Sequence, residues 1–204
     1  MRHFVDAHKG ATFLVVLLLM AIYRQWENPT AWIYLGLHGS YGLLWVMKSR
    51  TFPDRRWERS ASLWFGLVIW TGLSLYWIAP WMLASRDIHA PGWLLGLCVS
   101  LFAFGVFLHF TSDMQKFTAL HIQPEHLIQE GLWRRLRNPN YFGELLIYLS
   151  FALLAMHWLP LLILGLWVGL VWLPFMLQKD RSLARYAEFV AYKRRSKLFI
   201  PFLF

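Results

Sequence analysis

Long apolar stretches separated by short polar ones are the feature that most constrains the fold of this 204-residue chain. Hydrophobic residues make up 58% of it and charged residues 15%, and runs of about 20 apolar residues are typical of helices that cross a bilayer. We therefore predict an all-α membrane helix bundle in one domain, residues 1–204. Its six membrane spans are predicted at about 10–25, 31–47, 61–83, 91–110, 140–157 and 159–177.

The first and fifth of these spans are short and have polar ends, so five or seven spans remain open alternatives. The basic residues favour six. With both termini in the cytosol, all of the 20 Lys and Arg except Arg24 and Arg86 fall on the cytosolic side, as the positive-inside rule requires. This topology explains the net charge of +9, and we expect no nucleic-acid partner. No small-residue cleavage site follows the first span, which we expect to be retained.

A polar segment at the entrance of the fifth span, Gly131 to Glu144, reads G-L-W-R-R-L-R-N-P-N-Y-F-G-E. Asn138 and Pro139 suit the cap and the first turn of a helix. The free N–H groups of such a helix start attract anions. Three arginines add positive charge beside it: Arg134, Arg135 and Arg137. The segment predicts a site for a phosphate-bearing ligand.

Polar residues continue at helical spacing along the fifth span. Asn140, Glu144 and Tyr148 recur every four residues and would share one helix face. A carboxylate inside a membrane needs a partner. Arg134 or Arg137 would serve Glu144 structurally, and a ligand amide or ribose hydroxyl would serve it functionally.

The end of the fourth span carries a similar face. If the helix continues past residue 110, His109, Asp113 and Lys116 lie on one side of it. Asp113 would then lie next to Lys116 and accept a hydrogen bond from a ligand. A solvated helix end with a local ion pair explains the same spacing without a ligand.

The second span carries Tyr34, His38 and Tyr41 on one face. Buried Tyr and His side chains can deliver a proton to a substrate carbonyl. The alternative is a histidine that is hydrogen-bonded to a neighbouring helix.

The C-terminal tail, from Lys179 onward, alternates basic and aromatic residues at helical spacing. An amphipathic helix on anionic lipid explains this pattern, and residues 198–204 would then pack against the spans. Alternatively, Arg181 and Tyr192 close over a ligand.

Several classes of chemistry have no signature in the chain. The single Cys98 cannot form an intrachain disulfide, and no Cys/His spacing suggests a metal, so we expect none. The G-x-G-x-x-G, phosphate-loop, H-E-x-x-H and G-x-S-x-G motifs are also missing. A dinucleotide would have to be bound by helices and loops.

The segment S-D-M-Q-K at 112–116, the segment 131–144 and the tail ending in I-P-F-L-F together resemble the steroid 5-alpha-reductase family. The similarity is greatest to its short bacterial members with a DUF1295-type C-terminal region, and it covers about residues 102–204. It implies a bundle that binds NADPH from the cytosolic side of the bacterial inner membrane. The family reduces a carbon–carbon double bond conjugated to a ketone, here in a steroid- or lipid-like substrate that enters from the bilayer.

In this reading, residues 1–100 form the substrate side and 101–204 the cofactor-binding region. Asp113, Asn140 and Glu144 fall on cofactor-contact positions of the family, and Tyr141 keeps the N-Y-F-G-E frame. Arg134 and Arg137 are chosen for the phosphates from their charge. The candidate cofactor site is Asp113, Lys116, Arg134, Arg137, Asn140, Tyr141, Glu144, Arg181 and Tyr192.

The chain departs from this pattern in places. Many bacterial relatives have histidine where this chain has Asn138, and steroid-reducing members tend to have asparagine where it has His109. The family's glutamate–tyrosine pair, which holds the substrate carbonyl, has no clear counterpart. Tyr34, His38 and Tyr41 are therefore the candidate proton donors.

Two alternatives remain. The isoprenylcysteine carboxyl methyltransferases share an Arg-x-Pro-x-Tyr-x-Gly element and bind S-adenosylmethionine, which carries no phosphate. The basic surround and the D-M-Q-K segment favour the reductase over this methyltransferase reading. The other alternative is a non-catalytic membrane protein with the same fold. Membrane lipids are expected partners in every case, and the sequence does not indicate an oligomeric state.

Overall fold

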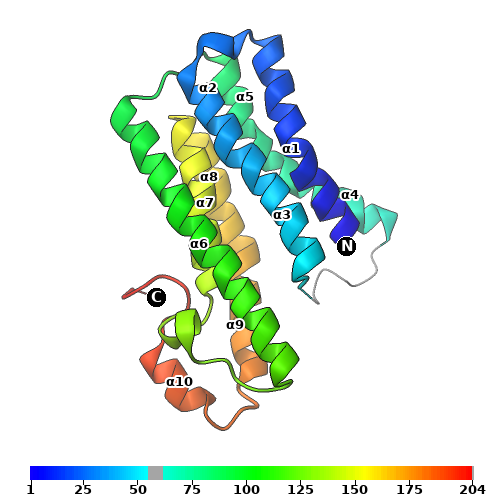
Figure 1. Ribbon diagram of the computed structural model, residues 1–204, viewed down its shortest axis with the longest axis vertical. Coiled ribbons are helices and arrows are strands. Elements are labelled where there is room, and N and C mark those ends of the chain that lie inside the picture. Colours follow the sequence, from blue (N-terminus) through cyan, green and yellow to red (C-terminus); the bar gives the residue numbers. More distant parts are fainter. Residues whose placement is uncertain (55–61, 204) are drawn as a thin grey trace.

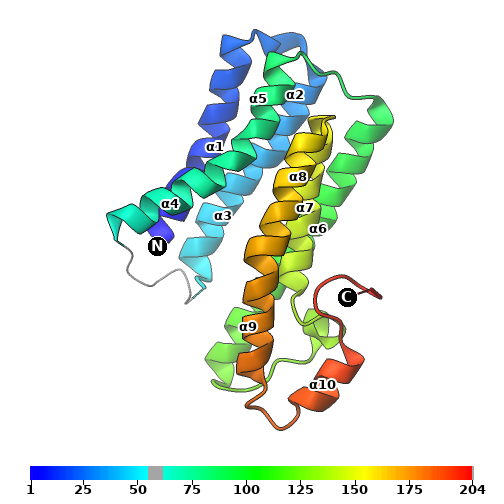
Figure 2. The ribbon, with the colours of Figure 1, turned by 180° about the vertical axis from the view of Figure 1, so that it is seen from behind.

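The computed structural model describes residues 1–54 and 62–203, which are helical for most of their length (Figures 1 and 2). The predicted all-α class is confirmed. In chain order the helices are α1 (Arg2–Ile22), α2 (Pro29–Tyr34), α3 (Ser40–Thr51), α4 (Leu63–Ser74), α5 (Ile78–Ser85), α6 (Gly92–Ile122), α7 (Pro139–Leu154), α8 (Trp158–Trp167), α9 (Leu173–Leu183) and α10 (Phe189–Arg195).

Irregular turns join some of these helices into longer segments. A π-helical turn at Leu35–Gly39 joins α2 to α3, and another at Val168–Trp172 joins α8 to α9. A 3₁₀ turn at Leu75–Trp77 joins α4 to α5. Turns of these kinds change the direction in which the next side chains point, and π turns occur often at functional sites.

Among the described residues, four helices are long and apolar enough to cross a membrane: Arg2–Ile22, Leu63–Ser85, Gly92–Ile122 and Trp158–Leu183. They indicate a multi-pass integral membrane protein. Two further predicted spans correspond to the segment 29–51, which carries buried polar residues, and to α7, which has 16 residues. Neither has the length and apolarity that define the four.

The start of the first predicted span is corrected by the structure. The sequence predicts it from residue 10, whereas α1 begins at Arg2. His8 and Lys9 are buried against other helices, so their polarity marks a contact inside the bundle rather than the end of the apolar helix.

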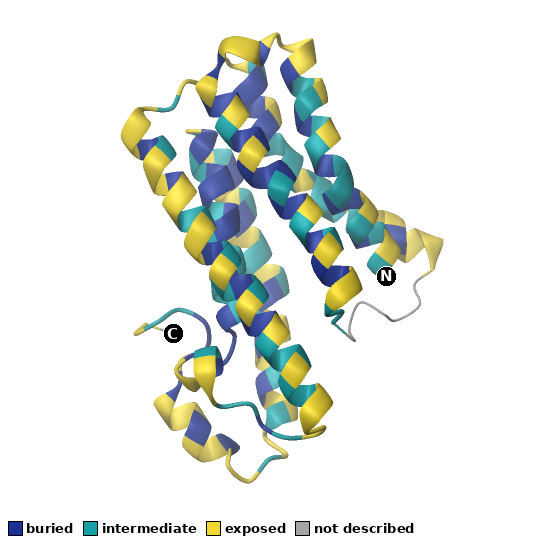
Figure 3. Ribbon diagram, viewed as in Figure 1, coloured by how far each residue is buried: buried dark blue, intermediate teal, exposed yellow. Residues whose placement is uncertain are grey.

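The surface of the bundle is apolar on its outer side. Exposed residues follow the outer face of the α6 ribbon, and its buried residues lie toward the neighbouring helices (Figure 3). Trp64, Phe104 and Leu170 are among the large apolar residues that remain exposed. Because an apolar surface of this extent is unstable in water, it supports a lipid environment.

Glycines allow the closest helix contacts. A Cβ atom on Gly143 would lie 2.5 Å from the backbone nitrogen of His109, and one on Gly105 would lie 2.7 Å from the carbonyl oxygen of Gly143. The backbones of α6 and α7 therefore touch, as small residues permit between membrane helices. Gly42 serves α1 and α3 in the same way, since its Cβ would lie 2.0 Å from the Lys9 carbonyl oxygen.

The tail folds back against the start of α7 (Figure 1). A parallel bridge pairs Leu136 with Lys197, and Phe189 and Tyr192 of α10 pack against Leu127. Leu198 and Phe199 are buried, as predicted, but Phe202 is 93% exposed. In the tail from Lys179 onward, α9 continues to Leu183 and α10 covers Phe189–Arg195, so the predicted tail helix is divided in two.

Candidate functional site

A buried group of charged and aromatic side chains lies where α1, α3 and α7 meet. The Lys9 ammonium donates a hydrogen bond to the Tyr41 hydroxyl at 3.0 Å, and that hydroxyl donates to Glu144 Oε1 at 3.1 Å. Lys9 Nζ lies 3.5 Å from Glu144 Oε1 and 3.6 Å from the centre of a Trp45 ring. Glu144, Tyr41, Lys9 and Trp45 are called the Glu144 cluster below.

The partner of Glu144 differs from the expectation. Neither Arg134 nor Arg137 pairs with it in the structure; Lys9 does, from a helix far away in the sequence. From the sequence, Lys9 counts only as one of the basic residues that set the membrane topology. The signal that could identify it is its place directly before the apolar run of α1, where a buried charge requires an opposite one.

The second-span candidates all face the interior. Tyr34, His38 and Tyr41 are at most 5% exposed. The Tyr34 hydroxyl lies 2.9 Å from His38 Nδ1, and the His38 ring stacks on Phe151 at 4.2 Å. The hydrogen-bond partner of His38 thus lies on its own helical segment, one turn away, rather than on a neighbouring helix.

The fourth-span face is continuous because α6 runs to Ile122, as the spacing requires. Asp113 accepts a 2.6 Å hydrogen bond from Lys48, and both side chains are buried. Lys116 pairs with Asp54 at 2.7 Å. Asp113 therefore forms its direct ion pair with Lys48 of α3 and not with Lys116, which lies near it on α6.

Three residues of α6 and α7 have buried polar atoms without a partner. Among the described residues, His109 Nε2, Asp113 Oδ1 and Asn140 Oδ1 have no hydrogen-bond partner. Their residues are neighbours, because His109 Nδ1 donates to the Asn140 carbonyl oxygen at 3.1 Å and Asp113 follows His109 by one helical turn. These atoms are called the open polar set. Such unsatisfied groups are costly unless a ligand or water completes them.

Arg137, proposed for phosphate binding, is occupied by the protein. Its Nε lies 3.0 and 3.1 Å from the two carboxylate oxygens of Asp180, and its Nη1 donates to the Ser196 carbonyl oxygen at 2.6 Å. Arg134 and Arg181 are exposed. Arg137 therefore ties the tail to α9, and the exposed arginines remain available to a ligand.

Tyr192 also ties the tail. Its hydroxyl donates to the Trp133 carbonyl oxygen at 2.5 Å. Burial raises the pKa of Tyr192 to about 12, so the donor stays protonated over the physiological range. Tyr141, by contrast, is half-buried, with its ring edge-on to Trp172 at 5.6 Å.

The start of α7 agrees in part with the expectation. Asn138 occupies the cap position and Pro139 the first turn. The Asn138 side chain donates to the Leu198 carbonyl oxygen at 3.0 Å and makes no capping bond. Lys179 donates to the Arg137 carbonyl oxygen. This helix start is therefore held by the tail and α9.

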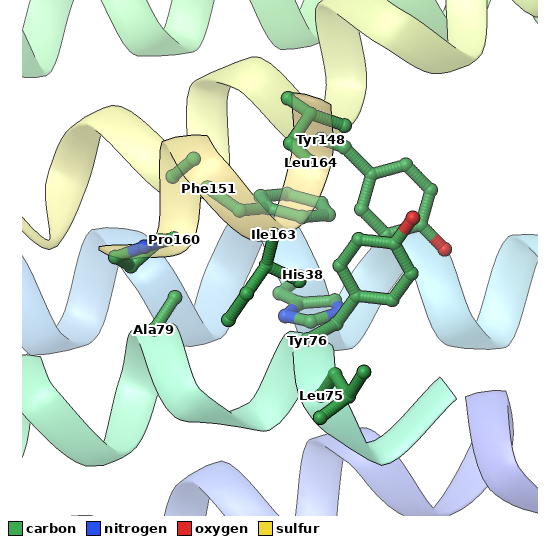
Figure 4. A pocket seen from close by; sticks show the side chains of 10 residues that line it. His38, Leu75, Tyr76, Ala79, Tyr148, Phe151, Pro160, Ile163 and Leu164 are labelled. Carbon is green, nitrogen blue, oxygen red and sulfur yellow. The ribbon is translucent and has the colours of Figure 1, made fainter. Parts of the chain in front are cut away.

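Two pockets adjoin these residues. One lies between α5, α7 and α8, has a volume of only about 10 Å³, and includes His38, Tyr76 and Tyr148 in its wall (Figure 4). The other, also of about 10 Å³, lies at the start of α1 and includes Asp6, Trp45 and Lys48 in its wall. The Glu144 cluster adjoins both pockets. Its Tyr41 packs against Tyr148, which lines the first pocket, and its Trp45 lines the second.

The chain belongs to the DUF1295 family, described as a protein of unknown function, whose match extends over residues 1–199. This match includes the N-terminal helices, beyond the region 102–204 that carries the motif resemblance. No curated protein matches the chain.

Proposed function

We propose that this membrane protein is an NADPH-dependent reductase of a carbon–carbon double bond conjugated to a ketone, in a lipophilic substrate. The observation that supports it most is the open polar set between α6 and α7, close to the Glu144 cluster. In the proposal, the open polar set binds the cofactor, and the Glu144 cluster donates a proton to the substrate.

The open polar set suits the uncharged part of a dinucleotide. Asp113 Oδ1 and Asn140 Oδ1 are acceptors, which ribose hydroxyls and a carboxamide N–H would satisfy. Lys116, Glu144 and Tyr141 border this region from the same helices. Bound NADPH would supply the hydride, and the protein would supply its binding and orientation.

The phosphates require cations, and the structure changes which ones we assign. Arg134 and Arg181 are exposed and available. Arg137 is saturated by Asp180 and Ser196, so its role in the proposal is to fix the tail, together with Tyr192, beside the helix start. A tail held in this way can shield a ligand from water.

Tyr41 is the best placed of the proton-donor candidates. Its hydroxyl contacts both an ammonium and a carboxylate, so a proton that it gives to a substrate oxygen can be replaced from Lys9. Tyr34 and His38 form a second, separate pair. Proton delivery of this kind accounts for part of the rate of an enzyme, typically about 10²–10⁴-fold.

One observation also supports the alternative methyltransferase function. The acceptors Asp113 Oδ1 and Asn140 Oδ1 would equally receive hydrogen bonds from the ammonium and ribose hydroxyls of S-adenosylmethionine. Because Arg137 is occupied, the preference for a phosphate-bearing ligand depends on the exposed arginines.

The topology in this proposal has six crossings, with both termini in the cytosol. The segment 29–51 and α7 lie beside the four long apolar helices (Figures 1 and 2). Their polar residues face other helices instead of lipid, which removes the hydropathy signal of a span without preventing a crossing. The membrane would be the bacterial inner membrane.

Thermal unfolding of the detergent-purified protein tests the proposal. NADPH should raise the melting temperature, and S-adenosylmethionine should not. In Asn140→Ala, the NADPH concentration needed for the same stabilisation should rise about ten-fold or more. The melting temperature of the free protein should not fall, because Asn140 Oδ1 has no partner to lose. Gln178→Ala, on the exposed side of α9, is the matched control. Stabilisation by S-adenosylmethionine alone would establish the methyltransferase, and no stabilisation by either would favour a non-catalytic protein.

A further inference from the structure

The segment after α10 carries two large apolar side chains that the protein does not cover. Leu198 and Phe199 belong to the main hydrophobic core of the bundle, and Ile200 packs against it. Phe202 and Leu203, a few residues further, are 93% and 79% exposed. Because two adjacent apolar side chains are costly to leave in water, they indicate contact with an apolar environment outside the protein.

This segment returns from α10 to the level at which α7 begins (Figures 1 and 2). The Asn138 side chain, at the cap position of α7, donates to the Leu198 carbonyl oxygen at 3.0 Å. In the six-crossing topology the start of α7 marks the cytosolic boundary of the bilayer. Phe202 and Leu203 therefore lie near that boundary, where apolar side chains can enter the hydrocarbon region.

Two exposed cations lie beside this segment. The Lys197 N–H donates to the Arg135 carbonyl oxygen at 2.9 Å, so the two residues are held next to each other. Both are exposed, and within the part of the chain that the structure describes neither forms an ion pair. Cations at a bilayer surface attract the phosphate groups of anionic lipids. Neither residue is among those assigned to the cofactor phosphates, so the two ligands do not compete for them.

The helix α10, which precedes this segment, uses its aromatic side chains inside the protein. Phe189 and Tyr192 pack against Leu127, and the Tyr192 hydroxyl donates to the Trp133 carbonyl oxygen. In both views α10 lies below the segment and further from the bundle (Figures 1 and 2). The aromatic residues of α10 that the sequence predicts for the membrane surface are therefore not the ones available to lipid.

We propose that the segment 197–203 is a lipid anchor. Phe202 and Leu203 insert among the acyl chains of the cytosolic leaflet, and Arg135 and Lys197 bind the phosphate of an anionic lipid such as phosphatidylglycerol. Ionic attraction brings the segment to the surface, and burial of the two apolar side chains holds it there. The proposed topology names the leaflet; the anchor does not depend on the cofactor or on the substrate.

Spin-label accessibility in lipid nanodiscs tests the insertion. In a Cys98→Ser background, a nitroxide is attached at Phe202→Cys, and its collisions with oxygen, which is enriched in the bilayer, are compared with those of a water-soluble nickel complex. In nanodiscs that contain phosphatidylglycerol the effect of oxygen should exceed that of nickel several-fold. The same label at Val190→Cys, an exposed apolar position on α10, should give the reverse. Equal ratios at the two positions would overturn the inference.

Native mass spectrometry of the detergent-purified protein tests the anionic lipid. The wild type should bind phosphatidylglycerol more tightly than phosphatidylcholine. One cation near an anionic surface contributes roughly five-fold to binding, so Arg135→Gln with Lys197→Gln should raise the phosphatidylglycerol concentration for half occupancy about ten-fold or more. Lys193→Gln with Arg194→Gln removes the same charge from exposed positions on α10 and should leave that concentration nearly unchanged. Equal losses in the two double variants, or equal affinity of the wild type for both lipids, would show that no specific anchor exists.

Discussion

Lys9 and Glu144 form one of the buried ion pairs in the bundle interior. Their side chains are 7% and 15% exposed, and two charges at this depth are tolerated only as a pair. Tyr41 and the Trp45 ring complete the surroundings of the ammonium. The cost is consistent with a functional role, because a purely structural contact could be made by apolar residues of similar size.

Removal of one partner should therefore destabilise the protein more than removal of both. Lys9→Met leaves a buried carboxylate without its cation and should cost about 3 kcal/mol of stability. The double variant Lys9→Met with Glu144→Gln should recover most of that loss. Thermal unfolding in detergent measures both, and an equal loss in the single and double variants would contradict the pairing.

Helical spacing predicted which polar residues share a face but not what those faces meet. Asn140, Glu144 and Tyr148 do lie on one helix, and so do His109, Asp113 and Lys116. The partners Lys9, Lys48 and Asp180 were not predicted, because each comes from a helix that is distant in the sequence. The role of Arg137 could not be read from charge alone, since its position next to Asp180 depends on how α9 packs.

At the scale of elements, the contact between α6 and α7 positions the open polar set. Gly105 and Gly143 bring the two backbones together, which places His109 next to Asn140. In the sequence, Gly143 stands out only as part of the N-Y-F-G-E frame. Its physical reason, the close approach of another helix, is visible only in the packed structure, as are the π and 3₁₀ turns.

Two glycines on α6 provide a matched test of this contact. Gly105→Ala places a Cβ 2.7 Å from the Gly143 carbonyl oxygen and should destabilise the protein by about 2 kcal/mol. Gly96→Ala meets nothing within 4 Å and should be neutral or stabilise the helix by up to about 1 kcal/mol. Equal melting temperatures for the two variants would contradict the close packing.

The tail should loosen when its ionic anchor is removed. Asp180→Ala leaves Arg137 without its carboxylate, and the chain after Ser196 then loses a rigid attachment. Trypsin should cleave after Lys197 several-fold faster, as located by mass spectrometry. Asp87→Ala, an exposed carboxylate, should leave the rate unchanged. Unchanged cleavage in Asp180→Ala would mean that other contacts hold the tail.

For the whole molecule, the apolar blocks predicted a membrane helix bundle, and the four long apolar helices agree with it. Length separates these from α7, which has 16 residues, and hydropathy separates them from the segment 29–51, which buries polar side chains against protein. Both termini lie in the lower half of Figure 1, which is compatible with an even number of crossings.

Reporter fusions test this topology. Green fluorescent protein at either terminus should fluoresce in bacterial cells, and alkaline phosphatase at the C-terminus should be inactive. In a Cys98→Ser background, a cysteine placed at Asp87 should react with an impermeant reagent added from outside. Active alkaline phosphatase at the C-terminus would contradict six crossings with cytosolic termini.

The account as a whole depends on hydride transfer inside this bundle. NADPH deuterated at the transferable position of its nicotinamide, incubated with the protein in nanodiscs and cholest-4-en-3-one, should give a saturated ketone that carries one deuterium on the β carbon. Tyr41→Phe should lower the rate about 100-fold or more if Tyr41 delivers the proton. A product without deuterium, or turnover that requires S-adenosylmethionine instead, would contradict the proposal.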